Sequence, residues 1–127
     1  MPWSLHYTST DRVLTLKVEG PFTADDLVSM TRDTYDELRK EHALRVLLDY
    51  STAVAKVSIP EIYKLPDLYA ELRAPRHAHL ALVISADDNQ RETFQFYEDL
   101  AVNRGIFAKL FDDAATAKAW LLEFKDR

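Results

Sequence analysis

Five aspartates stand where an acid could do chemistry, at or just beyond the ends of predicted strands: Asp49, Asp87, Asp88, Asp112 and Asp113. In an open α/β sheet, the carboxyl ends of the strands form the edge at which ligands bind. Carboxylates gathered there could hold Mg²⁺ and support phosphoryl chemistry. An aspartate at a helix start also serves as an N-cap, a role that needs no ligand. We favour capping and expect no metal site at these positions.

Two histidines are the second candidate for metal chemistry. His77 and His79 flank one residue at the start of a predicted strand, so both would lie on the same strand face. A zinc site needs at least a third protein ligand, and the sequence offers no obvious one. The spacings also assemble no nucleophile, base and orienting group. We therefore expect no metal, no cofactor and no catalytic residue, and a protein that is not an enzyme.

Composition and length exclude several further classes of protein and of binding site. The chain has 127 residues, a length typical of one domain, which we place at residues 1–127. Its formal net charge of −5 argues against a nucleic-acid partner, and its lack of cysteine excludes disulfides and thiolate sites. The two glycines, Gly20 and Gly105, cannot form a phosphate-binding loop. No apolar stretch is long enough for membrane insertion and the first residues lack a signal-peptide pattern, so we expect a cytoplasmic protein.

The first half of the chain predicts a hairpin, a helix and a buried strand. Apolar residues alternate with polar ones at 3–7 and again at 14–18, which is typical of two strands with one buried face. We expect Gly20-Pro21 to stop the second strand. Thr23 is the expected cap of a helix that runs to about residue 41. A strand should follow at 44–50, ending near Asp49, and a loop at 51–57.

The second half predicts further helix and strand units. Ser58 and Glu61 match a capping box. Pro66 must kink the helix that follows, or divide it, because proline lacks the amide donor. Gly105 suits a left-handed helix stop. The other expected elements are a strand at 80–84, a helix from after residue 88 to about 104, a strand at 107–111 and a helix at 113–124.

This order of elements resembles the STAS fold of anti-sigma-factor antagonists. The resemblance is carried by Gly20–Thr23 before the first helix and by Val46–Asp49 in a central strand. It is closer to the SpoIIAA-like subfamily in the stretch Asn103–Leu121, which has a final strand, an acidic turn and an alanine-rich helix with Trp-Leu. The resemblance implies a single α/β domain, with a five-stranded mixed sheet and about four to five helices packed on it. The subfamily also resembles apolar-ligand carriers of the CRAL-TRIO type.

A switch surface is the first functional site that the resemblance implies. In the antagonists, a serine just after the central strand's aspartate is phosphorylated by a partner kinase, and this controls partner binding. Asp49 matches that aspartate, although Asp49-Tyr-Ser-Thr52 replaces the antagonists' Asp-Ser-Ser-Gly turn. A phosphate on Ser58 would lie at a helix start, which favours an anion, so we prefer Ser58 as the acceptor. The candidate partner or phospho-switch surface is Asp49, Tyr50, Ser51, Thr52, Val54 and Ser58.

Aromatic residues form the second candidate site. Aromatic side chains that converge between helices and sheet can line a ligand pocket, with hydroxyl groups fixing the ligand's orientation. They can equally fill a core or form a homodimer face. Trp120 is expected in the core beside Ala117, Leu121 and Phe124, whereas Phe96 is expected to be exposed. The residues of the candidate apolar pocket are Tyr35, Tyr63, Tyr69 and Tyr97.

These patterns favour a regulatory protein over an enzyme. We expect it to act by binding a protein partner, with phosphorylation as a control. The alternative is a carrier or sensor of a small apolar, lipid-like ligand held between helices and sheet. A closed core would favour the first hypothesis, and an enclosed cavity would favour the second.

Overall fold

The structure is a computed structural model that describes residues 2–73, 77–85 and 90–123. Strands and helices alternate after an initial hairpin. The strands are β1 (Trp3–Thr8), β2 (Val13–Thr23), β3 (Arg45–Lys56), β4 (His79–Val83) and β5 (Phe107–Phe111). The helices are α1 (Ala24–Glu41), α2 (Ile59–Ile62), α3 (Leu65–Leu72), α4 (Arg91–Asn103) and α5 (Ala114–Leu121).

The five strands form one mixed sheet in the order β1-β2-β3-β4-β5. β1 pairs with β2 antiparallel, as the expected hairpin. Every later neighbour is parallel, because a helix carries the chain back across the sheet between strands. The predicted α/β class, the five strands and the mixed sheet are therefore confirmed.

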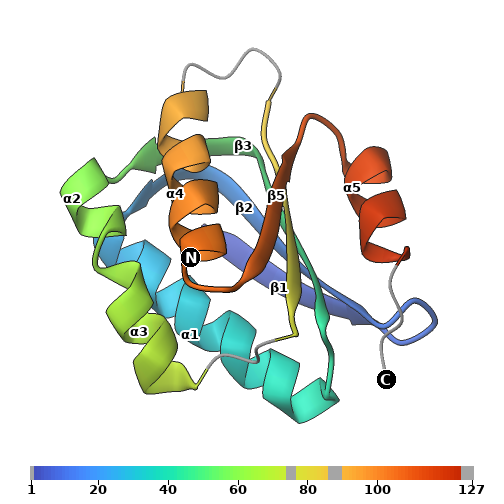
Figure 1. Cartoon of the computed structure of the whole chain (residues 1–127). Coiled ribbons are helices and arrows are strands. Elements are labelled where there is room, and N and C mark those ends of the chain that lie inside the picture. Colours follow the sequence, from blue (N-terminus) through green and yellow to red (C-terminus); the bar gives the residue numbers. More distant parts are fainter. Residues whose placement is uncertain (1, 74–76, 86–89, 124–127) are drawn as a thin grey trace.

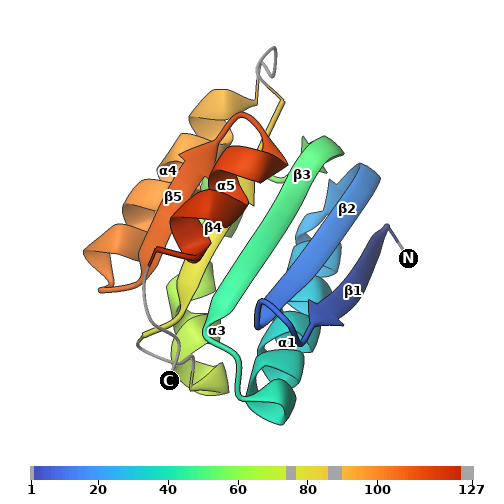
Figure 2. The same ribbon diagram turned by 90° about the vertical axis from the view of Figure 1, so that its right-hand side faces the viewer.

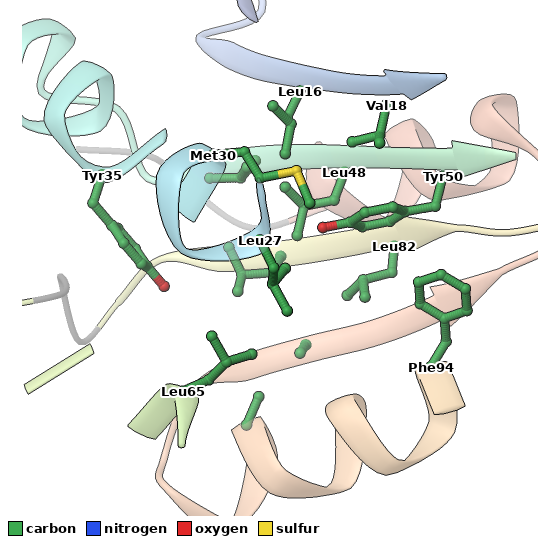
Figure 3. Close-up of a cluster of buried hydrophobic side chains, with 14 of the residues drawn as sticks. Leu16, Val18, Leu27, Met30, Tyr35, Leu48, Tyr50, Leu65, Leu82 and Phe94 are labelled. Atoms are coloured by element: carbon green, nitrogen blue, oxygen red, sulfur yellow. The ribbon is translucent and has the colours of Figure 1, made fainter. Parts of the chain in front are cut away.

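Helices cover the two faces of the sheet unequally. α1, α2, α3 and α4 lie on one face, and α5 lies on the other (Figures 1 and 2). The first face is the larger core, where Leu14, Leu16, Val46, Leu48 and Leu82 meet the helices (Figure 3). The second core is small and joins α5 to inward residues of the strands: Val13, Leu47, Ala81, Val83, Phe111, Ala117 and Leu121. α5 packs on β3, β4 and β5.

β2 and β3 are longer than the sequence predicts. β2 continues through Gly20 and Pro21 to Thr23, so the expected stop was wrong. The pairing of β1 with β2 stops at the Trp3–Val18 pair. Beyond Val18, β2 pairs with β3 alone, and a proline is tolerated in such an edge segment. Gly20 keeps the strand in register at a φ of 72°, a value that other residues rarely adopt.

Local helix signals are confirmed. The Thr23 hydroxyl accepts a hydrogen bond from the Asp26 backbone N–H at 3.2 Å, and the Asp26 carboxylate accepts one from the Thr23 backbone N–H at 2.9 Å. Ser58 caps α2, the chain divides between α2 and α3 just before Pro66, and Gly105 follows α4 at a φ of 81°. The predicted entry to α4 at 86–89 and the end of the last helix, including Phe124, lie outside the described residues.

Two aromatic residues differ from prediction. Trp120 is half-buried rather than a core residue, and its ring lies 5.5 Å from His79 and 5.6 Å from Phe111. The reason is that α5 alone forms the second layer, so only Ala117 and Leu121 face the sheet squarely. Phe96 is also half-buried rather than exposed, because it packs against the large core.

The second core predicts unequal effects for two adjacent leucines. Leu121 is fully buried, whereas Leu122 is 43% exposed. We expect Leu121→Ala to lower the free energy of unfolding by about 2–5 kcal/mol, because it leaves a cavity under α5. The control Leu122→Ala should change it by no more than about 0.5 kcal/mol. Urea unfolding of both variants is the measurement, and equal losses would mean that α5 is not docked in this way.

Candidate functional site

The segment after Asp49 is a strand, not the predicted loop. β3 pairs with β2 as far as Lys56 opposite Thr23. Between the pairs Lys17–Asp49 and Glu19–Thr52, β2 advances by two residues and β3 by three. One extra residue in β3 makes a β-bulge at Tyr50-Ser51, which redirects the strand without ending it. The candidate surface is therefore held on a rigid sheet.

A residue alternation beyond the bulge explains why the strand continues. Ala53, Ala55 and Val57 contact the large core, while Thr52, Val54 and Lys56 are exposed. The sequence contains this alternation, but two consecutive polar residues, Ser51 and Thr52, separate it from the apolar run before Asp49. The bulge shifts the pattern by one residue, and a bulge has no local signal that the sequence alone reveals.

The Asp49 carboxylate stabilises the bulge. Its Oδ1 accepts hydrogen bonds from the Ser51 backbone N–H at 3.0 Å and from the Ser51 hydroxyl at 2.7 Å. Its Oδ2 lies 3.3 Å from the Lys17 ammonium group on β2. Partial burial tends to raise the pKa of Asp49, but the Ser51 hydrogen bonds and the Lys17 charge outweigh it, so the pKa is lowered. The carboxylate is thus a structural group of the bulge and is occupied on both oxygens.

Gln90 supports the far half of β3, and sequence reasoning missed it. β4 ends opposite Asp49, so no further residue of β4 pairs with β3 at Ala53 or Ala55. The Gln90 side-chain amide donates to the Ala53 carbonyl at 3.3 Å and accepts from the Ala55 backbone N–H. One amide side chain thus makes the donor and acceptor contacts that another strand residue would make. Its position 35 residues away from Ala55 gave no sequence signal.

The structure separates the predicted surface residues into two groups. Tyr50 is 6% exposed and its ring packs on Phe22 and Phe94, with centroids 5.6 and 5.1 Å away. Its expected place on the surface was therefore wrong, because the bulge turns its side chain into the core. Asp49 and Ser51 are half-buried and bonded to each other. The exposed members are Thr52, Val54 and Ser58.

Ser58 and Glu61 form the predicted capping box at the start of α2. The Ser58 hydroxyl accepts from the Glu61 backbone N–H at 3.3 Å, and a Glu61 carboxylate oxygen accepts from the Ser58 backbone N–H at 2.9 Å. These bonds from Ser58 lower the pKa of Glu61. α2 is only four residues long, and a carboxylate already occupies its first turn. The expected attraction of a Ser58 phosphate to this helix start is therefore opposed by Glu61.

A groove borders this surface on the side of α4. It has a volume of about 640 Å³ and is lined by Ile59 of α2 and by Arg91, Glu92, Gln95, Phe96 and Asp99 of α4. Ile59 is exposed, and Tyr63, directly after α2, is 61% exposed. The Tyr63 ring lies 6.0 Å from the Phe96 ring. The prediction that Tyr63 lines an internal pocket was wrong, since the turn between α2 and α3 points it outward.

The other predicted pocket residues do converge inside the molecule. The Tyr69 hydroxyl donates to the Tyr97 hydroxyl at 2.6 Å, and the Tyr35 and Tyr69 rings meet edge to face at 5.8 Å. Two small cavities adjoin these rings, each with a volume of about 20 Å³. That is room for roughly one water molecule in each. The core is therefore nearly closed in this structure.

Asp112, Asp113 and His79, which were considered for chemistry, have structural partners. Asp113 caps α5, accepting from the Thr116 backbone N–H at 2.7 Å, and Asp112 pairs with Arg91. Asp87 and Asp88 lie outside the described residues. The His79 ring stacks on Phe107 at 4.5 Å, and its pKa is lowered, mainly by burial. Within the described part of the chain, no three histidines or acids gather as metal ligands.

Comparison with known proteins gives a likeness of fold. No family model matches the chain, and no curated protein matches it. An uncharacterised protein of the DUF3478 family with a SpoIIAA-like fold, from Shewanella loihica PV-4, superposes with a TM-score of 0.59 at 18% identity. That match covers 94% of this chain and 91% of the other. The fold is SpoIIAA-like.

Two structures of SpoIIAA itself superpose on the same fold. The anti-sigma factor antagonist SpoIIAA in its unphosphorylated form gives a TM-score of 0.53 at 13% identity, covering 93% of this chain and 94% of that one. The Bacillus cell fate determinant SpoIIAA in its phosphorylated form gives 0.52 at 14% identity, covering 92% and 98%. At these identities the SpoIIAA-like fold is what the chains share.

Among the described residues, no helix is both long and apolar enough to cross a membrane.

The bulge predicts a pH-dependent contribution to stability. The folded-state pKa of Asp49 is lowered, so its stabilisation is present above the unfolded pKa and is lost as pH falls through the folded pKa. At pH 7 we expect Asp49→Asn to lower the free energy of unfolding by about 1–3 kcal/mol, since it removes an ionised acceptor. The difference from wild type should shrink as pH falls below about 4.

Urea unfolding at several pH values measures this effect. Ser51→Ala is the matched control, because it removes the hydroxyl donor but keeps the backbone N–H donor to Asp49. Its loss should be smaller than that of Asp49→Asn and should depend on pH in the same direction. A difference between Asp49→Asn and wild type that stays constant from pH 7 to pH 3 would contradict the assigned role of the carboxylate.

Proposed function

We propose that this SpoIIAA-like protein is a non-enzymatic regulator that acts by binding a protein partner through the end of β3 and α2. The β3–α2 surface consists of Thr52, Val54, Ser58, Ile59 and Tyr63. The observation that carries the proposal is the exposure of two apolar side chains, Ile59 and Tyr63, at the groove of about 640 Å³. A third apolar side chain, Val54, is exposed on the end of β3 that leads into α2. Exposed apolar groups that gather beside a groove are typical of a docking site.

The rigidity of this surface supports the proposal. The Asp49 hydrogen bonds at the bulge, the Gln90 amide and the Ser58–Glu61 capping box fix the backbone of the β3–α2 surface at three points. A surface that is ordered before binding loses less conformational entropy when a partner docks. The comparisons are consistent with this proposal, since SpoIIAA is described as an anti-sigma factor antagonist.

A phospho-switch at this surface would work through the capping box. SpoIIAA has been solved in unphosphorylated and phosphorylated forms, and Ser58 is the exposed serine at this surface. A phosphate on Ser58 would place two like charges together, because the Ser58 hydroxyl lies 3.0 Å from the Glu61 carboxylate. Repulsion would break the capping box and displace the start of α2. A phosphate on Ser51 would meet Asp49 in the same way at 2.7 Å.

The carrier hypothesis receives no comparable support. A lipid-like ligand between helices and sheet needs an internal space, and the two cavities there hold about 20 Å³ each. Tyr63, one of the four expected pocket residues, lies outside the core. We therefore retain partner binding as the proposed function and do not propose a carrier.

The proposal predicts which variant loses its partner. Val54→Asp replaces an exposed apolar side chain of the β3–α2 surface by a charge and should abolish partner capture from an extract of the source cells. Leu122→Asp is the matched control, because Leu122 is 43% exposed and Val54 is 42% exposed, while α5 and α2 lie on opposite sides of the domain (Figure 1). It should capture the same proteins as wild type, as measured by quantitative mass spectrometry.

Ser58→Asp tests the switch separately. Aspartate can still cap a helix, so the variant should fold, but its charge lies beside Glu61 and should weaken capture. Circular dichroism of each variant checks the fold. If folded Val54→Asp and folded Ser58→Asp both capture the wild-type set of partners, the β3–α2 surface is not the working surface.

A further inference from the structure

One side of α4 is a stripe of polar residues with a single aromatic residue in it. Glu92, Gln95, Phe96 and Asp99 occupy positions i, i+3, i+4 and i+7 of the helix, which places them on the same side. All four line the groove of about 640 Å³ between α4 and α2. Figure 1 shows the two helices on the same face of the sheet. One wall of the groove is therefore a regular helix surface.

The apolar part of the groove is small and accessible. Ile59 of α2 is 39% exposed, and Phe96 is half-buried because it packs on the large core. The Tyr63 ring lies beside Phe96, tilted by 33° against it. Ile59 is the first residue of α2 and directly follows Ser58. An apolar side chain of a partner can therefore insert between α2 and α4, and a displaced start of α2 would remove one of the two walls.

The charged part of the groove is negative. Glu92 and Asp99 are exposed on its α4 wall. The Gln95 side-chain amide donates to the Asp99 carboxylate at 3.2 Å and to the neighbouring Glu98 carboxylate at 3.1 Å. Gln95 is neutral, so these bonds position the two carboxylates without cancelling their charge. In the part of the chain that the structure describes, Glu92, Glu98 and Asp99 form no ion pair.

The nearby bases do not offset these acids. Arg91 lines the groove, but its guanidinium group pairs with the Asp112 carboxylate. Lys64 directly follows Tyr63, but it lines a different groove, between α1 and the segment α2–α3, together with Asp25 and Glu61. The groove between α2 and α4 thus combines an apolar site with carboxylates that have no cationic partner among the described residues.

We propose that this groove binds a basic amphipathic segment of the partner protein. The segment inserts an apolar side chain between Ile59 and Phe96 and places Lys or Arg beside Glu92 and Asp99. The inference rests on the proposed function, because it names the kind of partner for the groove at the β3–α2 surface. Complementary charges across an interface fix the orientation of the partner and speed its association. An acidic segment would instead place like charges together, which opposes binding.

The spacing on α4 indicates which sequence the partner segment should have. Glu92 and Asp99 lie about one helical turn to either side of Phe96. A partner helix that lies along the groove matches this spacing if it carries basic residues about one turn to either side of an apolar residue. We therefore expect Lys or Arg three or four residues before and after a large apolar residue.

Selection from a random library tests this chemistry directly. The full chain is immobilised and exposed to a phage library of helical scaffolds whose outward positions are randomised, because a preformed helix loses little entropy on binding. We expect enrichment of scaffolds with the basic–apolar–basic pattern. Enrichment of acidic or uncharged apolar scaffolds, or no enrichment at all, would overturn the proposal.

A double variant tests whether the enriched scaffolds bind at the groove. Glu92→Gln combined with Asp99→Asn should weaken their binding by roughly fivefold or more, because two ion pairs are lost. Asn at position 99 can still accept the bond from Gln95. The matched control is Glu19→Gln combined with Glu123→Gln, which removes two exposed carboxylates that do not line the groove. Fluorescence polarisation should give this control the affinity of wild type.

Salt dependence gives a second measurement on the same variants. Screening weakens exposed ion pairs, so wild-type affinity should fall as the salt concentration rises from about 0.05 M to about 0.5 M. The Glu92→Gln, Asp99→Asn variant should show a smaller fall. Equal affinities and equal salt dependence in the two double variants would contradict the proposal, because net charge and not the groove would then attract the scaffolds.

The apolar half of the groove is tested by Ile59→Ser. It should lower the affinity for the enriched scaffolds several-fold, whereas the control Leu122→Ser should not, although the two side chains are 39% and 43% exposed. Circular dichroism checks that each variant is folded. Unchanged affinity in folded Ile59→Ser would contradict insertion beside this residue.

These measurements can fail separately from the proposed function, because they do not use the natural partner. If Val54→Asp loses its partner from the extract while the scaffold results fail, the β3–α2 surface stands and the basic segment is rejected. If the scaffolds behave as expected while Val54→Asp keeps its partners, the groove retains its preference for a basic segment and the wider surface is rejected.

Discussion

The parallel pairing of β2 with β3 is the interaction on which the rest of the structure depends. It extends from Val13–Arg45 to Thr23–Lys56, across the whole length of the domain. β1 and β4 each pair with only the first part of these strands. The second part is therefore a two-stranded extension, and side-chain contacts support it where no neighbouring strand does. The bulge, the Gln90 amide and the capping box are those contacts.

This extension joins the candidate surface to the core. Side chains on one face of β3, from Tyr50 to Val57, help to close the large core, and the alternate side chains are exposed on the other face of the sheet. The same strand thus presents Val54 to solvent and places the Tyr50 ring in the large core. A change on the surface that moved the bulge would also move Tyr50, because the two are adjacent residues of one rigid strand.

The unequal coverage of the sheet gives each face a different role. Four helices on one face bury large side chains, including Tyr35, Tyr50 and Tyr69, and leave little empty volume. On the other face α5 covers only part of the sheet, and polar residues of β1 and β2 such as His6 and Lys17 remain accessible to solvent. An antiparallel hairpin tolerates such a solvated face, whereas parallel strands require cover on both sides.

The sequence by itself determined the local structure of this protein. The hairpin, the caps at Thr23 and Ser58, the division before Pro66 and the stop at Gly105 all depend on residues within a turn or two of one another. Such short-range signals are legible because their hydrogen-bond partners are near neighbours in sequence. The SpoIIAA-like order of strands follows from them, together with the short crossover connections that parallel strands require.

Only the tertiary structure decided where the functional residues lie. The continuation of β3 past Asp49, the inward turn of Tyr50 and the outward position of Tyr63 each depend on what neighbouring elements offer. Gln90 bonds to a residue 35 positions away, and Tyr69 bonds to one 28 positions away. No local pattern encodes such pairs, because the free energy that selects them comes from packing of the whole domain. Residue type therefore predicted the elements, while long-range contact determined which side chains share a site.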